Sequence, residues 1–185
     1  RQGRDVVVTC EPGGTVLGRR LRTLILGLDF RPAPLTELFM LLADRTQHVT
    51  EVVRPALEAG RLVLSDRYAD ATLAYQVGGR GLDGTMVEAA LHAATGALVP
   101  DLTLLLDVPV QVGWERVLAR GGADRLDQED LAFHQRVHAA YHRQALAEPE
   151  RIHSIDASVD PDTVHRRVLA EVTAVIERTA IERPE

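Results

Sequence analysis

Short apolar runs alternate with longer amphipathic stretches along the whole chain. Four of the runs have the length and the β-branched or leucine-rich composition of buried strands, and they cover residues 5–9, 62–65, 102–108 and 152–156. The stretches between them repeat their apolar residues at helical spacing. This alternation predicts an α/β fold in three layers, with helices on both faces of a parallel sheet.

The longest helical stretch lies between the first two predicted strands. Its pattern predicts a helix that Thr36 caps, that Pro55 bends or interrupts and that Gly60 ends. Thr15 is the expected cap of an earlier helix, and Pro161 is expected to open the last one. The expected helices other than the longest cover residues 15–27, 69–76, 84–95, 110–119, 128–147 and 161–178. No internal repeat is found, and the length predicts a single domain over residues 1–185.

Charged side chains follow the predicted strands at the point where each strand ends. They are Glu11, Asp66 with Arg67, Asp107 and Asp156. Ligands of open parallel sheets bind at the carboxyl ends of the strands. An acid at a strand end is also a common helix cap, so the prediction of a site depends on several polar ends meeting at one edge.

Composition narrows the classes of partner. The net charge of −6 argues against nucleic acid or an anionic membrane as the main partner, and no apolar run is long enough to cross a bilayer. The single Cys10 and the absence of a signal-peptide pattern predict a cytoplasmic protein. All 21 basic residues are arginine, so lysine-dependent chemistry is impossible within these 185 residues.

Six motifs occur in a fixed order along the chain: EPGGT (11–15), ADRTQH (43–48), SDRYADATLAYQ (65–76), GGRG (78–81), PDLTLLLDVP (100–109) and DRLDQEDLAFH (124–134). Together they resemble the bacterial thymidylate kinase (dTMP kinase) family, and the likeness runs from about residue 5 to residue 178. The resemblance implies a P-loop kinase fold with a mobile lid. It also implies transfer of the ATP γ-phosphoryl group to dTMP, giving dTDP for dTTP biosynthesis, with Mg²⁺ and a homodimer.

Phosphate recognition is expected to use arginine, because its planar fork holds two phosphate oxygens and stays charged. The resemblance implies that Arg67 and Arg22 hold the acceptor phosphate and that Arg67 also faces the transferring group. Asp66 would orient Arg67 or hold the magnesium shell. Arg80 would lie near the acceptor phosphate, and Glu11 within the acceptor site. A salt bridge for Arg67 and a solvated helix face for Arg22 are the alternatives.

Base recognition is assigned by the same resemblance to two helical pairs. Leu41 and Arg45 are four residues apart and share a helix face, where the family has a stacking aromatic ring and a thymine-reading arginine. Leu41 departs from that pattern, and a simple core role is its alternative. Thr72 and Gln76 would bond the thymine edge. Tyr75 would lie against the sugar, with ordinary packing as the alternative.

The polar loop 118–130 resembles the lid of the family. Arg116, Arg120 and Arg125 would close over the ATP phosphates, and the last two are candidate catalytic residues. A solvated charge cluster is the alternative for either of these two taken singly. His134, His138 and His142 lie four residues apart, and we interpret them as a solvated stripe rather than a zinc site.

The family motif G-x-x-x-x-G-K-[ST], which binds the ATP phosphates, does not occur in these 185 residues. We therefore expect residues 1–185 to be inactive by themselves, either as an N-terminally incomplete form of a normal enzyme or as a product that lacks the donor site. Two alternative functions follow. One is a non-catalytic nucleotide-binding remnant, and the other is a kinase for a different nucleoside monophosphate, which Leu41 suggests.

Overall fold

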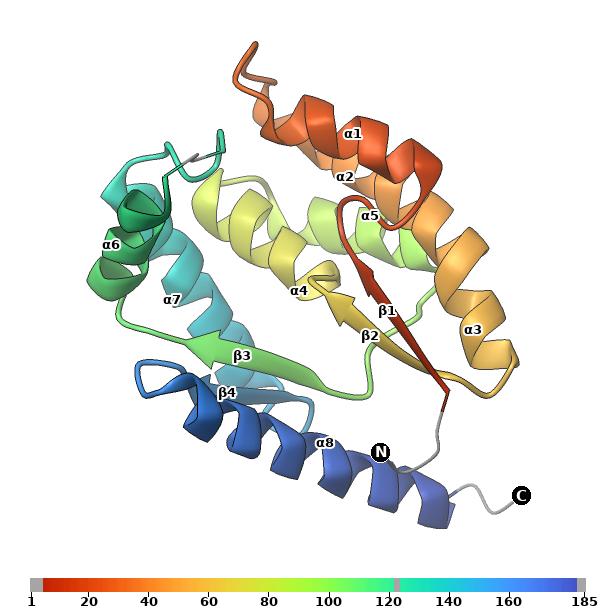
Figure 1. Cartoon of the computed structure of the whole chain (residues 1–185). Coiled ribbons are helices and arrows are strands. Elements are labelled where there is room, and N and C mark those ends of the chain that lie inside the picture. The colour runs from red at the N-terminus through yellow and green to blue at the C-terminus, as the bar shows by residue number, and fades with distance from the viewer. Residues whose placement is uncertain (1–4, 122–123, 183–185) are drawn as a thin grey trace. The chain divides into compact units, whose positions relative to one another are not determined.

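The computed structural model describes residues 5–121 and 124–182, and the side chains of all of these except residues 120 and 179–182. Each of two compact units contains one pair of parallel strands (Figure 1). The units are residues 1–99 with 122–140 and residues 100–121 with 141–185. The single domain expected over residues 1–185 stays a prediction.

The strand pair of the first unit confirms the first two predicted strands. β1 (Val6–Cys10) and β2 (Leu62–Asp66) run parallel, with Val6 opposite Leu62 and Cys10 opposite Asp66. Alternate residues share a face of a strand, so Val6, Val8 and Leu64 lie on one face of the pair. All three are exposed, with Val8 at 74%, so the described residues leave this face largely uncovered.

Two helices of the first unit differ in how they begin. α1 (Val16–Leu26) starts as predicted, because Thr15 Oγ1 accepts a hydrogen bond of 2.9 Å from the Gly18 amide. The predicted cap at Thr36 is wrong. α2 (Pro34–His48) starts two residues earlier without a side-chain cap, because Pro34 suits the first helical turn, where no amide partner is needed.

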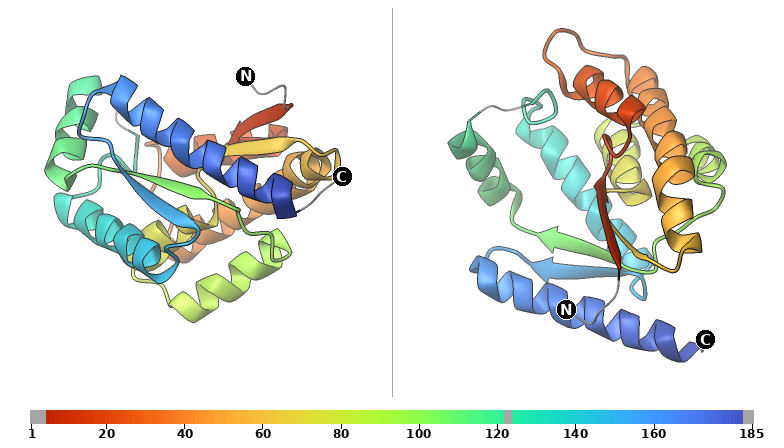
Figure 2. Two further views of the ribbon diagram at one scale, coloured as in Figure 1. Left: turned by 90° about the horizontal axis from the view of Figure 1, so that it is seen from below. Right: turned by 45° about the vertical axis from the view of Figure 1, so that its right-hand side comes forward.

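The helical run continues from α2 through a π-helical segment, η1 (Val49–Val53), into α3 (Arg54–Glu58). Pro55 has no N–H to donate, and the Arg54 amide just before it bonds the Val49 carbonyl in the wider turn. The predicted interruption at Pro55 is therefore confirmed, as a widened turn. The run lies along the β1–β2 pair (Figure 2).

The segment after β2 remains helical for longer than predicted. α4 (Ala69–Thr72) passes into a second π-helical segment, η2 (Leu73–Gly79), before α5 (Gly84–Thr95) begins. A side chain at Gly79 would meet the Phe133 ring at 2.6 Å, so glycine permits this close approach. Side chains of α2 and α5 form the buried centre of the unit: Leu38, Leu42, Val87 and Leu91.

The second unit contains β3 (Thr103–Asp107) and β4 (Ile152–Asp156), also parallel, which confirms the third and fourth predicted strands. α6 (Val110–Arg120) follows β3, and α8 (Pro161–Glu182) lies along β4 (Figure 2). α7 (Leu131–Ala147) contributes its first part to one unit and its second part to the other. Among the described residues, no helix has the length and apolar character needed to cross a membrane.

Candidate active site

The carboxyl ends of β1 and β2 lie side by side, as the parallel arrangement requires. The Glu11 amide, just after β1, donates 2.9 Å to the carbonyl of Asp66 at the end of β2. Arg67 follows with a positive φ of 68°, and its carbonyl accepts a hydrogen bond of 2.8 Å from Ser65 Oγ. A non-glycine residue in this left-handed region is uncommon and is concentrated at functional sites. The strand end therefore turns sharply at the predicted catalytic arginine.

Arg67 and Arg22 are the exposed arginines of this edge. The Arg67 guanidinium carbon lies 5.0 Å from the centroid of the Tyr75 ring, a cation–π distance. Arg22 Nη1 donates 2.8 Å to the carbonyl of Pro12, in the loop between β1 and α1. Two exposed arginines with anchored side chains can bind an anionic group, and their predicted contact with the acceptor phosphate stays a prediction.

Arg45 takes a different position, because it is buried at 2% exposure. Its Nε donates a hydrogen bond of 2.7 Å to Glu11 Oε2, and its Nη1 donates one of 2.9 Å to Thr72 Oγ1. The other oxygen of Glu11 lies 2.7 Å from Nδ1 of the buried His48, whose Nε2 lies 2.7 Å from Thr9 Oγ1. Two predicted base-reading residues, Arg45 and Thr72, are thus joined directly, and Glu11 anchors them.

Asp44 lies beside this network and is also buried. Its Oδ1 accepts 3.0 Å from the Gly13 amide, and its Oδ2 has no hydrogen-bond partner among the described residues. Burial raises the pKa of the Asp44 carboxyl, and the neighbouring Glu11 adds to that rise, while the Gly13 amide opposes it. A side chain at Gly18 would approach Asp44 Oδ1 to 2.2 Å, so α1 packs closely over this acid.

Gln76 and Arg80 meet on a second buried acid, Glu37 of α2. Gln76 Nε2 donates 2.7 Å to Glu37 Oε1, and Arg80 donates through Nε (3.2 Å) and Nη2 (3.1 Å) to the two oxygens. Arg80 also bonds Glu129 Oε1 at 2.9 Å and lies over the Phe133 ring at 4.6 Å. Burial opposes the charge of Arg80, but the two carboxylates outweigh it and raise the pKa of Arg80.

Arg125 of the predicted lid is buried in the first unit. Its Nη2 donates to Glu37 Oε2, and its Nε donates 2.8 Å to the Ile25 carbonyl at the end of α1. In this arrangement Arg125 ties the loop after residue 123 to α1 and α2. Its predicted contact with ATP stays a prediction, as does that of Arg120, whose side chain lies outside the described residues.

Two further predicted positions are described more simply. Leu41 is half-buried and is not among the residues of the buried cluster around Leu38 and Leu42, and its predicted place against the base stays a prediction. The Tyr75 ring packs edge to face against the Phe133 ring, with 6.0 Å between the ring centroids, and the Arg67 guanidinium lies over the Tyr75 ring. The predicted place of Tyr75 against the sugar stays a prediction.

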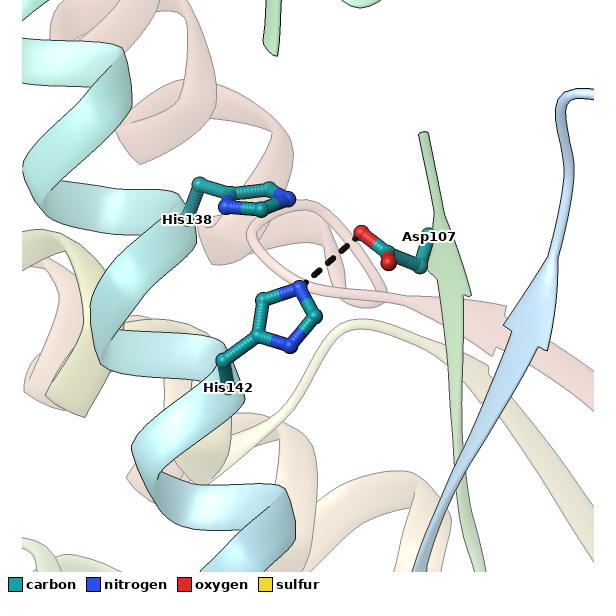
Figure 3. Close-up of side chains that lie close together, drawn as sticks. All are labelled: Asp107, His138 and His142. Carbon is teal, nitrogen blue, oxygen red and sulfur yellow. Dashed lines mark hydrogen bonds and ion pairs between the residues drawn. The ribbon is translucent and has the colours of Figure 1, made fainter. Parts of the chain in front are cut away.

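The second unit carries Arg116, Asp107 and His142. Arg116 is exposed, and its Nη1 donates 3.2 Å to the carbonyl of Ala157. His142 Nε2 lies 3.2 Å from Asp107 Oδ1 at the end of β3, and His138 lies one turn earlier on α7 (Figure 3). The ion pair shows that His142 is not only part of a solvated stripe, which the helical spacing could not reveal.

Three buried polar residues of this region were not singled out as site residues from the sequence: Glu37, Asp44 and His48, although the last two lie within the ADRTQH motif. All three lie on α2 and are nearly fully buried. One signal was available, because acids and a histidine interrupt the apolar face of an otherwise amphipathic helix. Charged groups are rarely buried unless they are paired, so such positions predict partners elsewhere in the chain.

Comparison with known proteins gives the family. The sequence profile described as thymidylate kinase matches residues 1–168. The chain belongs to the thymidylate kinase family. Thymidylate kinases of Desulfovibrio desulfuricans and Thermomicrobium roseum are 51% and 49% identical to it. These matches cover 96% and 95% of this chain, and 85% and 84% of the relatives.

A solved structure supports the same conclusion for the fold. The crystal structure of thymidylate kinase from Ehrlichia chaffeensis is 29% identical, with a TM-score of 0.75, and the match covers 91% of this chain and 81% of that one. The predicted P-loop kinase fold and enzyme family are thereby confirmed. The comparisons do not support the expected loss of the donor segment, since the two relatives match 95% or more of this chain.

Proposed function

We propose that this thymidylate kinase binds dTMP at the carboxyl ends of β1 and β2 and that the protein transfers the γ-phosphoryl group of ATP to it. The observation that carries the proposal is the buried set Glu11–Arg45–Thr72 beside the exposed Arg67. Held donors suit a nucleobase carbonyl, and an exposed arginine suits a phosphate.

Arg67 and Arg22 supply the charge that phosphoryl transfer requires at the acceptor. The reaction depends on positioning and charge neutralisation more than on covalent chemistry. Arg67 and Arg22 would hold the dTMP phosphate, and Arg67 would also face the group in transfer. The left-handed backbone at Arg67 and the Tyr75 ring limit where its guanidinium can lie.

Magnesium fits the chemistry of Asp66, an exposed carboxylate at the end of β2. Mg²⁺ keeps several waters and binds through one or two carboxylates together with substrate phosphates. Asp66 would therefore hold the hydrated ion, which would supply positive charge between the nucleotide phosphates. The alternative role of Asp66, orienting Arg67, leaves the same residue in the site.

The donor side of the proposal rests on arginine. Residues 1–185 contain no lysine, and by resemblance Arg116, Arg120 and Arg125 would contact the ATP phosphates, for which Arg125 would have to leave Glu37.

The test combines titration calorimetry of dTMP with a chromatographic assay of dTDP formation from ATP. dTMP binding that Arg67→Ala weakens roughly tenfold or more would support the acceptor site. Absence of dTMP binding would refute it. dTDP formation from ATP and dTMP would support the transfer reaction, and Arg67→Ala should lower it.

A different monophosphate acceptor is the second candidate function, and Leu41 favours it. The family has an aromatic ring at this position, whereas Leu41 offers no stacking face. A panel of dTMP, dUMP, dCMP, dGMP and dAMP separates the candidates. Preference for any acceptor other than a thymidine or deoxyuridine monophosphate would replace dTMP as the proposed substrate.

We also propose that the protein is cytoplasmic and that it forms a homodimer. The exposed side of α2 carries an apolar and small-residue stripe, with Phe39 at 56% exposure beside Leu35, Ala43 and Thr46. Such a stripe suits helix packing against a second copy. Light scattering after size-exclusion chromatography should give a dimer that Phe39→Glu dissociates, and a monomeric parent chain would contradict this interface.

A further inference from the structure

Glu37 is a buried carboxylate that binds three side chains from two separate segments of the first unit. Gln76, Arg80 and Arg125 all donate to it, and its exposure is only 1%. The two arginines account for its charge, since a buried carboxylate needs cationic partners. They do not account for the Gln76 contact, because an amide adds no charge.

The contact with Glu37 determines which way the amide of Gln76 faces. An ionised carboxylate only accepts hydrogen bonds, so the amide atom 2.7 Å from Glu37 Oε1 must be Nε2. The carbonyl oxygen Oε1 of Gln76 then faces elsewhere, and it has no hydrogen-bond partner among the described residues. Gln76 itself is only 1% exposed. A buried acceptor without a donor is unfavourable, and a ligand N–H in contact with it would remove that cost.

We propose that Glu37 is a positioning residue that sets the base specificity of the acceptor site. By holding the amide nitrogen of Gln76, it leaves only the amide oxygen available to the nucleobase. This selects a 4-oxo pyrimidine, whose N3 carries a proton, over a 4-amino pyrimidine, whose N3 is a bare acceptor. The inference rests on the proposed acceptor site, in which Gln76 contacts the base edge.

Glu37 also prevents the adjustment that would admit the wrong base. A flipped Gln76 amide would point its N–H groups at the N3 of cytosine. The flip would, however, turn the amide oxygen toward the Glu37 carboxylate, where two acceptors repel each other. Specificity of this kind comes from the unfavourable pairing of the wrong ligand as much as from the favourable pairing of the right one.

The test measures the ratio of dTMP to dCMP affinity, by calorimetry, for the parent chain and for Glu37→Gln. A glutamine at position 37 can donate as well as accept, so Gln76 becomes free to flip. We expect the dTMP/dCMP ratio to fall roughly tenfold or more, with dUMP behaving like dTMP in both proteins. An equal loss of affinity for all three nucleotides would show a merely structural role and would overturn the proposal.

Glu129→Gln is the matched control. It removes the other carboxylate on Arg80, 2.9 Å from Nη1, and leaves the partner of Gln76 in place. The ratio should remain at the parent value in Glu129→Gln. It should also persist in Glu37→Asp, which keeps a group that only accepts. A ratio lost equally in all three variants would overturn the role assigned to Glu37.

Two outcomes separate this inference from the function on which it rests. A parent chain that binds no dTMP, or binds dCMP equally well, would refute the acceptor site itself. If Glu37→Gln fails to fold by circular dichroism, Gln76→Met replaces it, since methionine has a similar size and no amide. Retention of the full ratio in Gln76→Met would overturn the proposal, and its loss would support the amide as the group that discriminates.

Discussion

Replacing Arg45 by alanine should damage both stability and dTMP binding, because its guanidinium is part of the folded core. The side chain is 3% exposed and its Nε lies 2.7 Å from Glu11 Oε2, which is equally buried. Removing one partner of a buried ion pair costs about 3–5 kcal/mol, since the other charge is left without compensation. For a chain of this size, each kcal/mol lowers the melting temperature by about 2–4 °C. We therefore expect a fall of about 6–20 °C.

The effect on ligand affinity can be separated from the effect on the fold. A hydrogen bond from a charged donor contributes about 1.5–3 kcal/mol, so dTMP affinity should fall roughly tenfold to hundredfold. The double variant Glu11→Gln with Arg45→Met removes both charges and keeps an acceptor for His48. Uncharged replacement of a buried pair is often neutral, so this variant should recover melting temperature but not dTMP affinity.

The assay is calorimetric scanning together with dTMP titration, and Arg54→Ala serves as the control. Arg54 Nη2 donates a hydrogen bond of 2.9 Å to the Thr95 carbonyl at the end of α5, and the loss of this contact should leave dTMP affinity unchanged. An Arg45→Ala protein that melts within about 2 °C of the parent would refute the buried-pair reasoning. Unchanged dTMP affinity in a folded variant would remove Arg45 from the site.

Three further predictions follow from the same unit. Leu41→Phe should tighten dTMP binding through stacking worth about 1–3 kcal/mol, since Leu41 is half-buried and outside the core cluster; weaker binding at an unchanged melting temperature would contradict it. Burial raises the pKa of the Asp44 carboxyl above 3.8, so the stability that this group contributes is lost as pH rises through the raised pKa. Asp44→Asn should therefore gain stability relative to the parent over that pH range, and a pH-independent difference in urea unfolding would exclude this. Arg67→Gly relieves a left-handed backbone, so its melting temperature should hardly change while dTMP affinity falls, and a large loss of stability would assign Arg67 a structural role.

Periodicity was sufficient to predict the strands. All four predicted runs are strands, and 152–156 matches β4 in both limits. Local chemistry was less reliable at helix ends. The Thr15 cap was predicted correctly because its partner, Gly18, is three residues away, whereas the cap assigned to Thr36 ignored the competing preference of Pro34 for a first turn. The π-helical segment η2 extends the helix through Gly78 and Gly79, beyond the predicted end at residue 76.

The sequence singled out candidate site residues but could not give their contacts. Motifs identified Arg45, Thr72, Gln76 and Arg80, yet none of their partners lies nearby in the sequence. Glu37 receives Arg125 from 88 residues away and Arg80 from 43 residues away. A loop rich in Asp and Glu predicts a solvated surface, so the burial of Arg125 could not be inferred from it. Long-range pairing depends on tertiary packing, which single-sequence patterns do not contain.

Three arginines of the first unit differ in their surroundings, and the difference bears on why the motif after β2 ends as it does. Arg45 and Arg125 are buried and neutralised by acids of the chain, which makes them parts of the scaffold as well as candidates for recognition. Arg67 is exposed, and its own backbone conformation costs on the order of 1–3 kcal/mol. Glycine would fit that backbone without strain, so packing alone does not call for arginine there. We therefore interpret Arg67, in this conformation at the carboxyl end of a parallel strand, as the residue that would bind the acceptor phosphate in the proposed site.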